Sequence, residues 1–138
     1  MRPRHLLIVD DNKADIFLIR EALDLAGVNA QIHIVNDGQA ARLFFEAADR
    51  EPGAPVTAMV LLDLNLPKAN GEEVLALLRA SVACRQAQVV VVTSSDSPRD
   101  RERLTNLGIA GYFRKPSEYN EFLKLGPIVK DLFDPQQP

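Results

Sequence analysis

Short runs of apolar residues alternate along the chain with longer stretches in which apolar residues recur every three or four positions. The short runs are typical of buried β-strands, and the longer stretches are typical of amphipathic helices. The strands are predicted at residues 5–9, 31–35, 59–62, 88–92 and 111–114. Strands that alternate with helices indicate βαβ units, so we expect an α/β protein with a parallel sheet.

Capping and breaking residues place the helices between these strands. The helices are predicted to run from Ile16 to Gly27, from Asp37 or Gly38 through Ala47, from Gly71 through Leu78, from Pro98 to Leu107 and from Ser117 to Phe133. Ser97 before Pro98 is a typical helix start, and a turn-rich loop is expected over residues 49–55. Gly126 and Pro127 should kink or split the last helix, because proline lacks a backbone donor.

Five βα units with right-handed crossovers form a doubly wound sheet. The simplest strand order is 2-1-3-4-5, the order of flavodoxin-like folds. The run at residues 31–35 is more polar than the others, which favours an edge position. The length of 138 residues fits one domain, which we expect over residues 1–133, with a polar tail at 134–138.

Acidic residues follow two of the predicted strands. Asp10 and Asp11 end the first strand, and Asp63 ends the third. Strands 1 and 3 are neighbours in the predicted order, so the three carboxylates should meet at one rim, which is tolerable only beside a cation or a basic group. Thr93 and Lys115 end strands 4 and 5 at the same rim, so five strand ends are expected to form one pocket.

These residues stand in segments that together carry a family resemblance. The segments are LLIVDDN, LLDLNLPKANG, VVTSS and YFRKP, in that order and with the spacing usual for the family. The chain resembles the response-regulator receiver domains of two-component signalling, which are CheY-like, over essentially its whole length. Each segment alone is a weak signal, but the set in register is a specific one.

The resemblance implies that Asp63 accepts a phosphoryl group in a reaction that depends on Mg²⁺, with Mn²⁺ able to substitute. A carboxylate attacks a phosphorylated donor poorly because both are negative, so a cation is needed. Asp11 and Asp63 are expected to bind the ion directly, Asp10 through water, and Asn65 through its backbone carbonyl. The chain would be no enzyme in the usual sense, catalysing only its own phosphorylation and dephosphorylation.

Other residues receive roles through the same resemblance. Lys115 is expected to pair with Asp63 and then with a phosphoryl oxygen, while the Thr93 hydroxyl and the Ser94 N–H hold another oxygen. Thr93 and Tyr112 are expected to form a switch, in which the hydroxyl moves toward the phosphoryl group and the ring turns inward. The surface of helix 4, strand 5 and helix 5 would then change shape.

Two residues near the path of a hydrolytic water are expected to tune the lifetime of the phosphorylated state. They are Asn65 and Ser95, which stand two positions after Asp63 and Thr93. The direction of their effect is open.

The resemblance also indicates partners. The segments LDLNLPKANGEEVL, VVTSS and KPSEYNEFLKLG are similar to stand-alone receivers that accept phosphate from phytochrome-type sensor histidine kinases, such as a bacteriophytochrome. With no effector domain attached, output is expected through partner binding or through a homodimer. The dimer would use helix 4, strand 5 and helix 5, or an apolar stripe in the C-terminal segment. That stripe consists of Ile128, Val129, Leu132 and Phe133 and is equally expected to fold back on its own domain.

Several alternatives stay open at this point. The chain is also compatible with a phosphorelay intermediate that passes phosphate to a histidine phosphotransfer protein, or with a passive metal-binding module. A metal-dependent phosphohydrolase is disfavoured because such enzymes usually carry a second acid where this chain has Asn65. Taken alone, Asp10 and Asp11 are equally well explained as caps of the first helix.

Composition excludes some classes of function. Sixteen basic and nineteen acidic residues give a net charge of −3 and no evident basic face, so direct nucleic-acid binding is not expected. Cys84 is alone, and the chain has neither a signal peptide nor an apolar run near 20 residues. We expect a soluble cytoplasmic protein without a membrane segment, in which Cys84, His5 and His33 carry no chemistry.

Overall fold

The computed structural model describes residues 4–67, 70–95 and 97–133. Its centre is one parallel sheet with the strand order β2-β1-β3-β4-β5, as predicted. The strands are β1 (Arg4–Val9), β2 (Ala30–Val35), β3 (Thr57–Leu62), β4 (Gln88–Thr93) and β5 (Gly111–Arg114). The more polar strand β2 lies at an edge, because its partly exposed residues do not suit burial on both faces.

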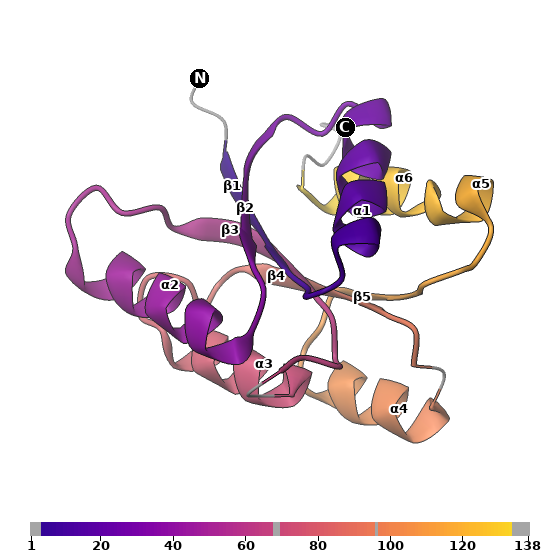
Figure 1. Cartoon of the computed structure of the whole chain (residues 1–138). Coiled ribbons are helices and arrows are strands. Elements are labelled where there is room, and N and C mark those ends of the chain that lie inside the picture. Colours follow the sequence, from indigo (N-terminus) through magenta and orange to yellow (C-terminus); the bar gives the residue numbers. More distant parts are fainter. Residues whose placement is uncertain (1–3, 68–69, 96, 134–138) are drawn as a thin grey trace.

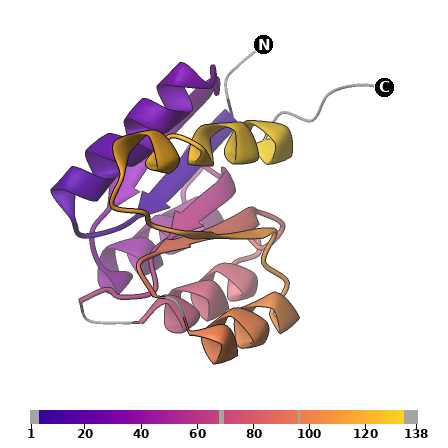
Figure 2. The same ribbon diagram turned by 90° about the vertical axis from the view of Figure 1, so that its right-hand side faces the viewer.

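Helices cover both faces of the sheet (Figures 1 and 2). Helices α1, α5 and α6 lie on one face, and α2, α3 and α4 lie on the other. Their bounds are α1 (Lys13–Leu25), α2 (Gly38–Arg50), α3 (Gly71–Ala80), α4 (Pro98–Asn106), α5 (Tyr119–Phe122) and α6 (Leu125–Phe133). The result is a three-layer α/β/α arrangement in which every strand-to-helix turn reaches the carboxyl rim of the sheet.

Two apolar clusters, one on each face, hold these layers together. Leu6 and Ile8 of β1 belong to the cluster under α1, α5 and α6. Leu7 and Val9 belong to the cluster above α2 and α3. Successive residues of a strand point to opposite faces, so a continuous apolar run fits a strand that is buried on both sides.

Side-chain caps begin five of the described helices; at α5 the cap is Glu118, whose carboxylate accepts the N–H of Asn120, and the other four share one geometry. In each of these four a side-chain oxygen accepts the backbone N–H three residues further on, which satisfies a donor that the helix leaves free. The four caps are Asn12, Asp37, Asn70 and Ser97. The predicted starts at Asp37 and at Ser97 with Pro98 are therefore confirmed.

Helix α2 is longer than predicted, because residues 49–50 belong to it rather than to the loop. Asp49 is held there by partners outside the helix: its Oδ1 accepts the hydroxyl of Ser81 and the N–H of Ala83, both at 2.8 Å. Helix α1 ends at Leu25, and Gly27 follows with φ at +75°. The glycine thus stops the helix as expected, in a conformation that glycine adopts without strain.

The last predicted helix is split, but not at the predicted place. The break lies between Phe122 and Leu125, whereas Pro127 lies in the first turn of α6. A proline is tolerated there because the first N–H groups of a helix have no partner within it. Gly126 serves a different purpose: a Cβ at this position would lie 2.3 Å from the carbonyl oxygen of Ala22, so only glycine lets α6 approach α1 this closely.

The apolar stripe of the C-terminal segment folds back on its own domain. Val129 and Phe133 are buried in the cluster under α1, and Leu132 packs against that cluster. Only Ile128 of the four is exposed. The stripe is therefore not free to cover a partner, and the predicted tail at 134–138 lies outside the described residues.

The described part of the chain contains no helix that is both long enough and apolar enough to cross a membrane.

Candidate functional site

The carboxyl ends of β1 and β3 bring the three predicted acids together. Val9 pairs with Leu62 across the two strands. The N–H of Asp63 donates to the Val9 carbonyl at 3.0 Å, and that of Asp10 donates to the Val35 carbonyl at 3.1 Å. One carboxylate oxygen from each of Asp10, Asp11 and Asp63 lies within 4.8 Å of the others. Asp10 and Asp63 are buried, and Asp11 is exposed.

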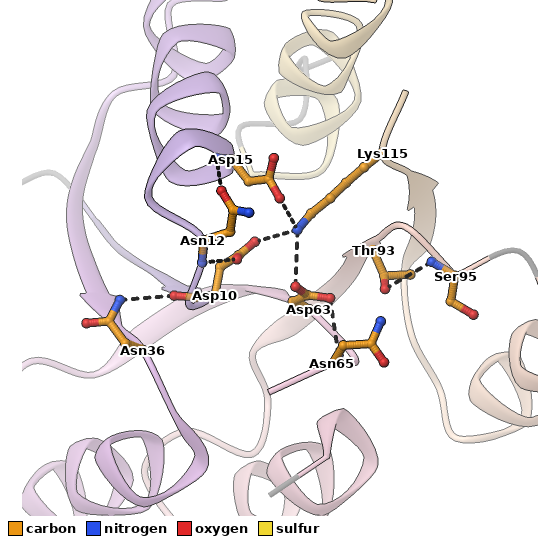
Figure 3. A network of polar contacts seen from close by, with 9 residues as sticks. All are labelled: Asp10, Asn12, Asp15, Asn36, Asp63, Asn65, Thr93, Ser95 and Lys115. Atoms are coloured by element: carbon orange, nitrogen blue, oxygen red, sulfur yellow. Dashed lines mark hydrogen bonds and ion pairs between the residues drawn. The ribbon is translucent and has the colours of Figure 1, made fainter. Parts of the chain in front are cut away.

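Lys115 reaches these acids from the end of β5. Its backbone N–H donates to the Thr93 carbonyl at 2.7 Å, which continues the hydrogen-bond ladder between β4 and β5. Its Nζ then donates to Asp63 Oδ2 at 3.1 Å and to Asp10 Oδ2 at 2.9 Å (Figure 3). The predicted pairing of Lys115 with Asp63 is thus present.

Asp15 is a third acid on the same ammonium, and the sequence analysis missed it. Its Oδ2 accepts from Lys115 Nζ at 2.8 Å. An ammonium has three N–H donors, so three carboxylates use its full donor capacity. Asp15 lies in the first turn of α1, beyond the loop that follows β1. In the sequence, its contact with Lys115 is indicated only by the presence of an acid shortly after Asp10 and Asp11.

Burial and charge act in opposite directions on this cluster. Burial raises the pKa of Asp10 above its ordinary value, although the Lys115 ammonium and the Asn12 N–H both act to lower it. Burial alone would lower the pKa of Lys115, but hydrogen bonds to Asp10 and Asp15 and the charges of Asp10 and Asp63 raise it well above its ordinary value. Lys115 is therefore charged throughout the physiological range, while Asp10 remains short of compensating positive charge.

The acidic pair does not cap helix α1. Asn12 is the cap, with its Oδ1 accepting the N–H of Asp15 at 3.0 Å. Asp10 instead accepts the N–H of Asn12 at 2.9 Å, and its own carbonyl accepts Asn36 Nδ2 at 3.0 Å. Asn12 and Asn36 hold the strand end in place, and neither was singled out from the sequence.

The remaining predicted residues border the acids. Thr93 is fully buried at the end of β4, and its hydroxyl accepts the Ser95 N–H at 3.4 Å, a long contact. Ser94 and Asn65 are exposed, and the Asn65 N–H donates to Asp63 Oδ1 at 3.2 Å. Figure 3 shows Asn65, Thr93 and Ser95 at the ends of the neighbouring strands β3 and β4, as expected from the order of the sheet.

Tyr112 is half-buried and linked to the segment after β4. Its hydroxyl donates to the Ser95 carbonyl at 3.1 Å. The guanidinium of Arg101 on α4 lies 5.2 Å from the centre of its ring. The ring therefore connects β5 with both the segment after Thr93 and helix α4.

The acids form a suitable set of ligands for a hard divalent cation. Mg²⁺ and Mn²⁺ prefer carboxylate, carbonyl and water oxygens, and three carboxylates at this spacing supply the first kind. The raised pKa of Asp10 shows that further positive charge would be favourable here. The residues present therefore fit such an ion.

Comparison with known proteins places the chain in a family. The sequence model of the response regulator receiver domain matches residues 6–125. Response regulator Rcp1 of Synechocystis sp. (strain ATCC 27184 / PCC 6803 / Kazusa) is 32% identical over 123 residues, which is 89% of this chain and 84% of Rcp1. Receiver domains are phosphoacceptors rather than conventional enzymes, and they bind a divalent metal at an acidic pocket.

Solved structures agree with that placement. The phosphorylated cyanobacterial phytochrome response regulator RcpA superposes with a TM-score of 0.86 at 29% identity, covering 99% of this chain and 98% of RcpA. The Mn²⁺-bound form of Rcp1 gives 0.84 at 29% identity, with the same coverage. The bacteriophytochrome response regulator AtBRR gives 0.75 at 33% identity, covering 100% and 98%. The chain belongs to the response regulator receiver domain family.

Proposed function

We propose that the chain is a single-domain response regulator that takes a phosphoryl group onto Asp63 from a sensor histidine kinase. The observation that carries this proposal is the cluster of Asp10, Asp11 and Asp63 at one rim. The Lys115 ammonium binds two of these acids, Asp10 and Asp63. Both oxygens of Asp63 are oriented, Oδ2 by Lys115 and Oδ1 by the Asn65 N–H. An oriented, partly neutralised carboxylate is what nucleophilic attack on phosphorus requires.

The transfer exchanges one bond to phosphorus for another. A bond forms between a carboxylate oxygen of Asp63 and phosphorus, while the bond from phosphorus to the imidazole nitrogen of the donor breaks. The electron pair of the broken bond stays on that nitrogen. Lys115 then donates to a phosphoryl oxygen, and the Thr93 hydroxyl with the Ser94 N–H donates to another, which stabilises the charge on the equatorial oxygens.

Asp11 and Asp63 would hold Mg²⁺ directly, Asp10 through water, and Asn65 through its backbone carbonyl, with Mn²⁺ able to replace it. The ion supplies positive charge that offsets the repulsion between the carboxylate and the phosphorylated donor. The Mn²⁺-bound form of Rcp1 supports this assignment by similarity. Asn65 and Ser95 then tune the lifetime of the phosphorylated state from the edge of the site.

The output of the switch is the surface of α4, β5 and α5. Movement of the Thr93 hydroxyl toward the phosphoryl group changes its long contact with the Ser95 N–H. Tyr112 senses that change, because its hydroxyl donates to the carbonyl of the same Ser95. The ring, which was expected to turn inward, already packs against the apolar cluster above α2 and α3. A change in its bond to Ser95 therefore alters how the ring is held there, and the altered face binds a partner or a second copy of the chain.

The donor is proposed to be a phytochrome-type histidine kinase, such as a bacteriophytochrome. Support comes from the relatives: RcpA is described as a phytochrome response regulator and AtBRR as a bacteriophytochrome response regulator. The match to each covers nearly the whole of both chains. Timed phosphotransfer from a purified bacteriophytochrome kinase, compared with an unrelated histidine kinase, tests the pairing. Equal rates from both kinases would contradict it.

Intact-mass spectrometry tests the phosphoacceptor role. The protein is incubated with acetyl phosphate and Mg²⁺, and the expected product is one added phosphoryl group that is stable in acid and labile in base. Asp63→Asn should remove the adduct, as should chelation of Mg²⁺, whereas Asp24→Asn, which removes a charge from the exposed face of α1, should retain it. Rapid turnover of generic phosphate esters would instead indicate a phosphohydrolase, and the absence of any adduct would indicate a passive module.

A further inference from the structure

Among the described residues whose side chains bind the Lys115 ammonium, Asp15 alone stands outside the three-acid group. It contributes the shortest of the three contacts to Nζ, 2.8 Å against 2.9 Å for Asp10 and 3.1 Å for Asp63. Its side chain is 26% exposed, while those of Lys115 and Asp63 are each 8% exposed. Asp15 therefore closes the solvent side of the ammonium from a different element, helix α1.

The start of α1 explains why this carboxylate is free to reach Lys115. In a capping box, a Glu or Gln three residues after the cap residue turns back to accept the N–H of that residue. Here Asp10 already accepts the N–H of Asn12 at 2.9 Å. Asn12 in turn fixes the backbone of Asp15 by accepting its N–H at 3.0 Å. The side chain of Asp15 is thus released from capping and points to Lys115, while its backbone stays fixed.

Phosphorylation changes the three contacts unequally. All three N–H donors of the Lys115 ammonium are in use, so it can donate to a phosphoryl oxygen only after its hydrogen bond to one of the carboxylates is broken. Once Asp63 is an acyl phosphate, its carboxyl oxygens lose their negative charge and accept hydrogen bonds more weakly. The donor that Asp63 releases is then available to the phosphoryl oxygen. The remaining contacts to Asp10 and Asp15 hold Nζ at the same position.

We propose that Asp15 is a positioning residue for phosphoryl transfer, acting by holding the Lys115 ammonium between α1 and β5 so that its third donor points at the group on Asp63. This inference rests on the proposed function, since it assigns Asp15 to the same reaction. Asp10 has a competing duty toward the divalent cation in that reaction. Asp15 has none, because it is not among the three acids whose oxygens lie within 4.8 Å of one another.

A spectroscopic measurement tests the positioning without any phosphoryl transfer. Lysine ammonium groups exchange rapidly with water, and their ¹H–¹⁵N signals persist only where hydrogen bonds hold them. The Lys115 signal, assigned by its absence in Lys115→Arg, should be visible in the wild-type protein and in Asp24→Asn. It should be lost or strongly broadened in Asp15→Asn. A Lys115 signal that is the same in Asp15→Asn and in the wild type would overturn the proposal.

Kinetics test the consequence for the reaction. With acetyl phosphate and Mg²⁺, Asp15→Asn should take up the phosphoryl group about tenfold more slowly than the wild type, Asp15→Glu should recover most of the rate, and Asp24→Asn should match the wild type. In a Lys115→Ala background, Asp15→Asn should cause no further fall, since a positioning residue has nothing left to position. An equal fall in both backgrounds, or no fall in either, would overturn the inference.

The failure of this inference is distinct from failure of the proposed function. If the wild-type protein takes up no phosphoryl group, the proposed function fails, whatever Asp15 does to the spectrum. If the wild type is phosphorylated and Asp15→Asn is equally fast, with circular dichroism showing both folded, only the role of Asp15 fails.

Discussion

Asp10 and Asp49 are aspartates in two different regions of the molecule, and their surroundings shift the carboxyl pKa in opposite directions. Asp49, at the end of α2, accepts two hydrogen bonds at 2.8 Å, from the Ser81 hydroxyl and the Ala83 N–H. The Ala83 N–H, followed by the Ser81 hydroxyl, lowers the pKa of Asp49. Asp10, at the rim, also has hydrogen-bond partners, yet burial raises its pKa.

This difference in pKa distinguishes a structural acid, Asp49, from an acid of the candidate site, Asp10. The donors of Asp49 come from the turn after α3, so its charge is satisfied by the fold itself and joins α2 to that turn. The charge of Asp10 is desolvated more than Lys115 and Asn12 compensate. Such a group costs stability and attracts a cation, which is how functional sites are distinguished from structural polar contacts.

The largest expected effect lies at the rim, in Lys115→Ala. Removal of the ammonium deletes a donor to the phosphoryl group and leaves three carboxylates without their shared cation, so phosphoryl uptake from acetyl phosphate should fall about 100-fold. Lys130→Ala, which removes a half-buried lysine bound to the Gly27 carbonyl, should leave the rate unchanged. Rates followed by intact mass decide the matter. Equal uptake by Lys115→Ala and wild type would place the chemistry elsewhere.

Ser81→Ala tests the structural contact between Asp49 and the turn after α3. The change removes the donor to Asp49 and also the acceptor of the Cys84 N–H, and both Ser81 and Cys84 are buried. The free energy of unfolding should drop by about 1–2 kcal/mol, measured by urea denaturation. Phosphoryl uptake should be unaffected, because the hydroxyl of Ser81 contacts Asp49 and Cys84, and neither of these residues lies at the rim. A variant with normal stability but slow uptake would reverse the assignment of the two regions.

Asp10→Asn should stabilise the fold while harming the site. Because its pKa is raised in the folded state, ionised Asp10 costs stability wherever the unfolded chain ionises it, above its ordinary value of 3.8. The asparagine variant should therefore be more stable at neutral pH by about 1 kcal/mol, and the advantage should vanish as the pH falls below that value. Urea midpoints measured across this range provide the check. A variant less stable than wild type at neutral pH would show that Lys115 compensates Asp10 fully.

Asp49→Asn should show the opposite dependence on pH, with the smallest effect. A lowered pKa means that Asp49 stabilises the fold above its ordinary value of 3.8 and loses this contribution as the pH falls through its folded value. The variant should be less stable than wild type at neutral pH, and the gap should narrow on acidification. Thermal unfolding at several pH values measures this gap. A gap that is constant with pH would mean that the hydrogen-bond geometry, rather than the charge, stabilises this turn.

The rim was predictable because parallel strands align their carboxyl ends. An apolar run followed by an acid specifies both the strand and the side on which the acid emerges, so the meeting of Asp10, Asp63 and Lys115 follows from strand order alone. Asp15 was missed because its contact depends on the rotation of α1 and on which residue caps it. Neither of these is visible in an apolar pattern.

The ends of the helices were less predictable for a related reason. Pro127 was expected to break the last helix, but a proline is compatible with a first turn as well as with a break, and the packing of Gly126 against Ala22 selects the former. Similarly, Asp49 reads as a turn-former until its partners Ser81 and Ala83 are known. Tertiary contacts decided these positions.

The central claim is that the rim assembles a single acceptor, and locating the phosphoryl group tests it most directly. After reaction with acetyl phosphate and Mg²⁺, borohydride reduction converts an aspartyl phosphate to homoserine, which peptide mass spectrometry can locate. We expect homoserine at residue 63 alone, and only after reaction with the phosphodonor. Modification at Asp10 or Asp11 instead, or a phosphoryl group carried by His5 or His33, would contradict it.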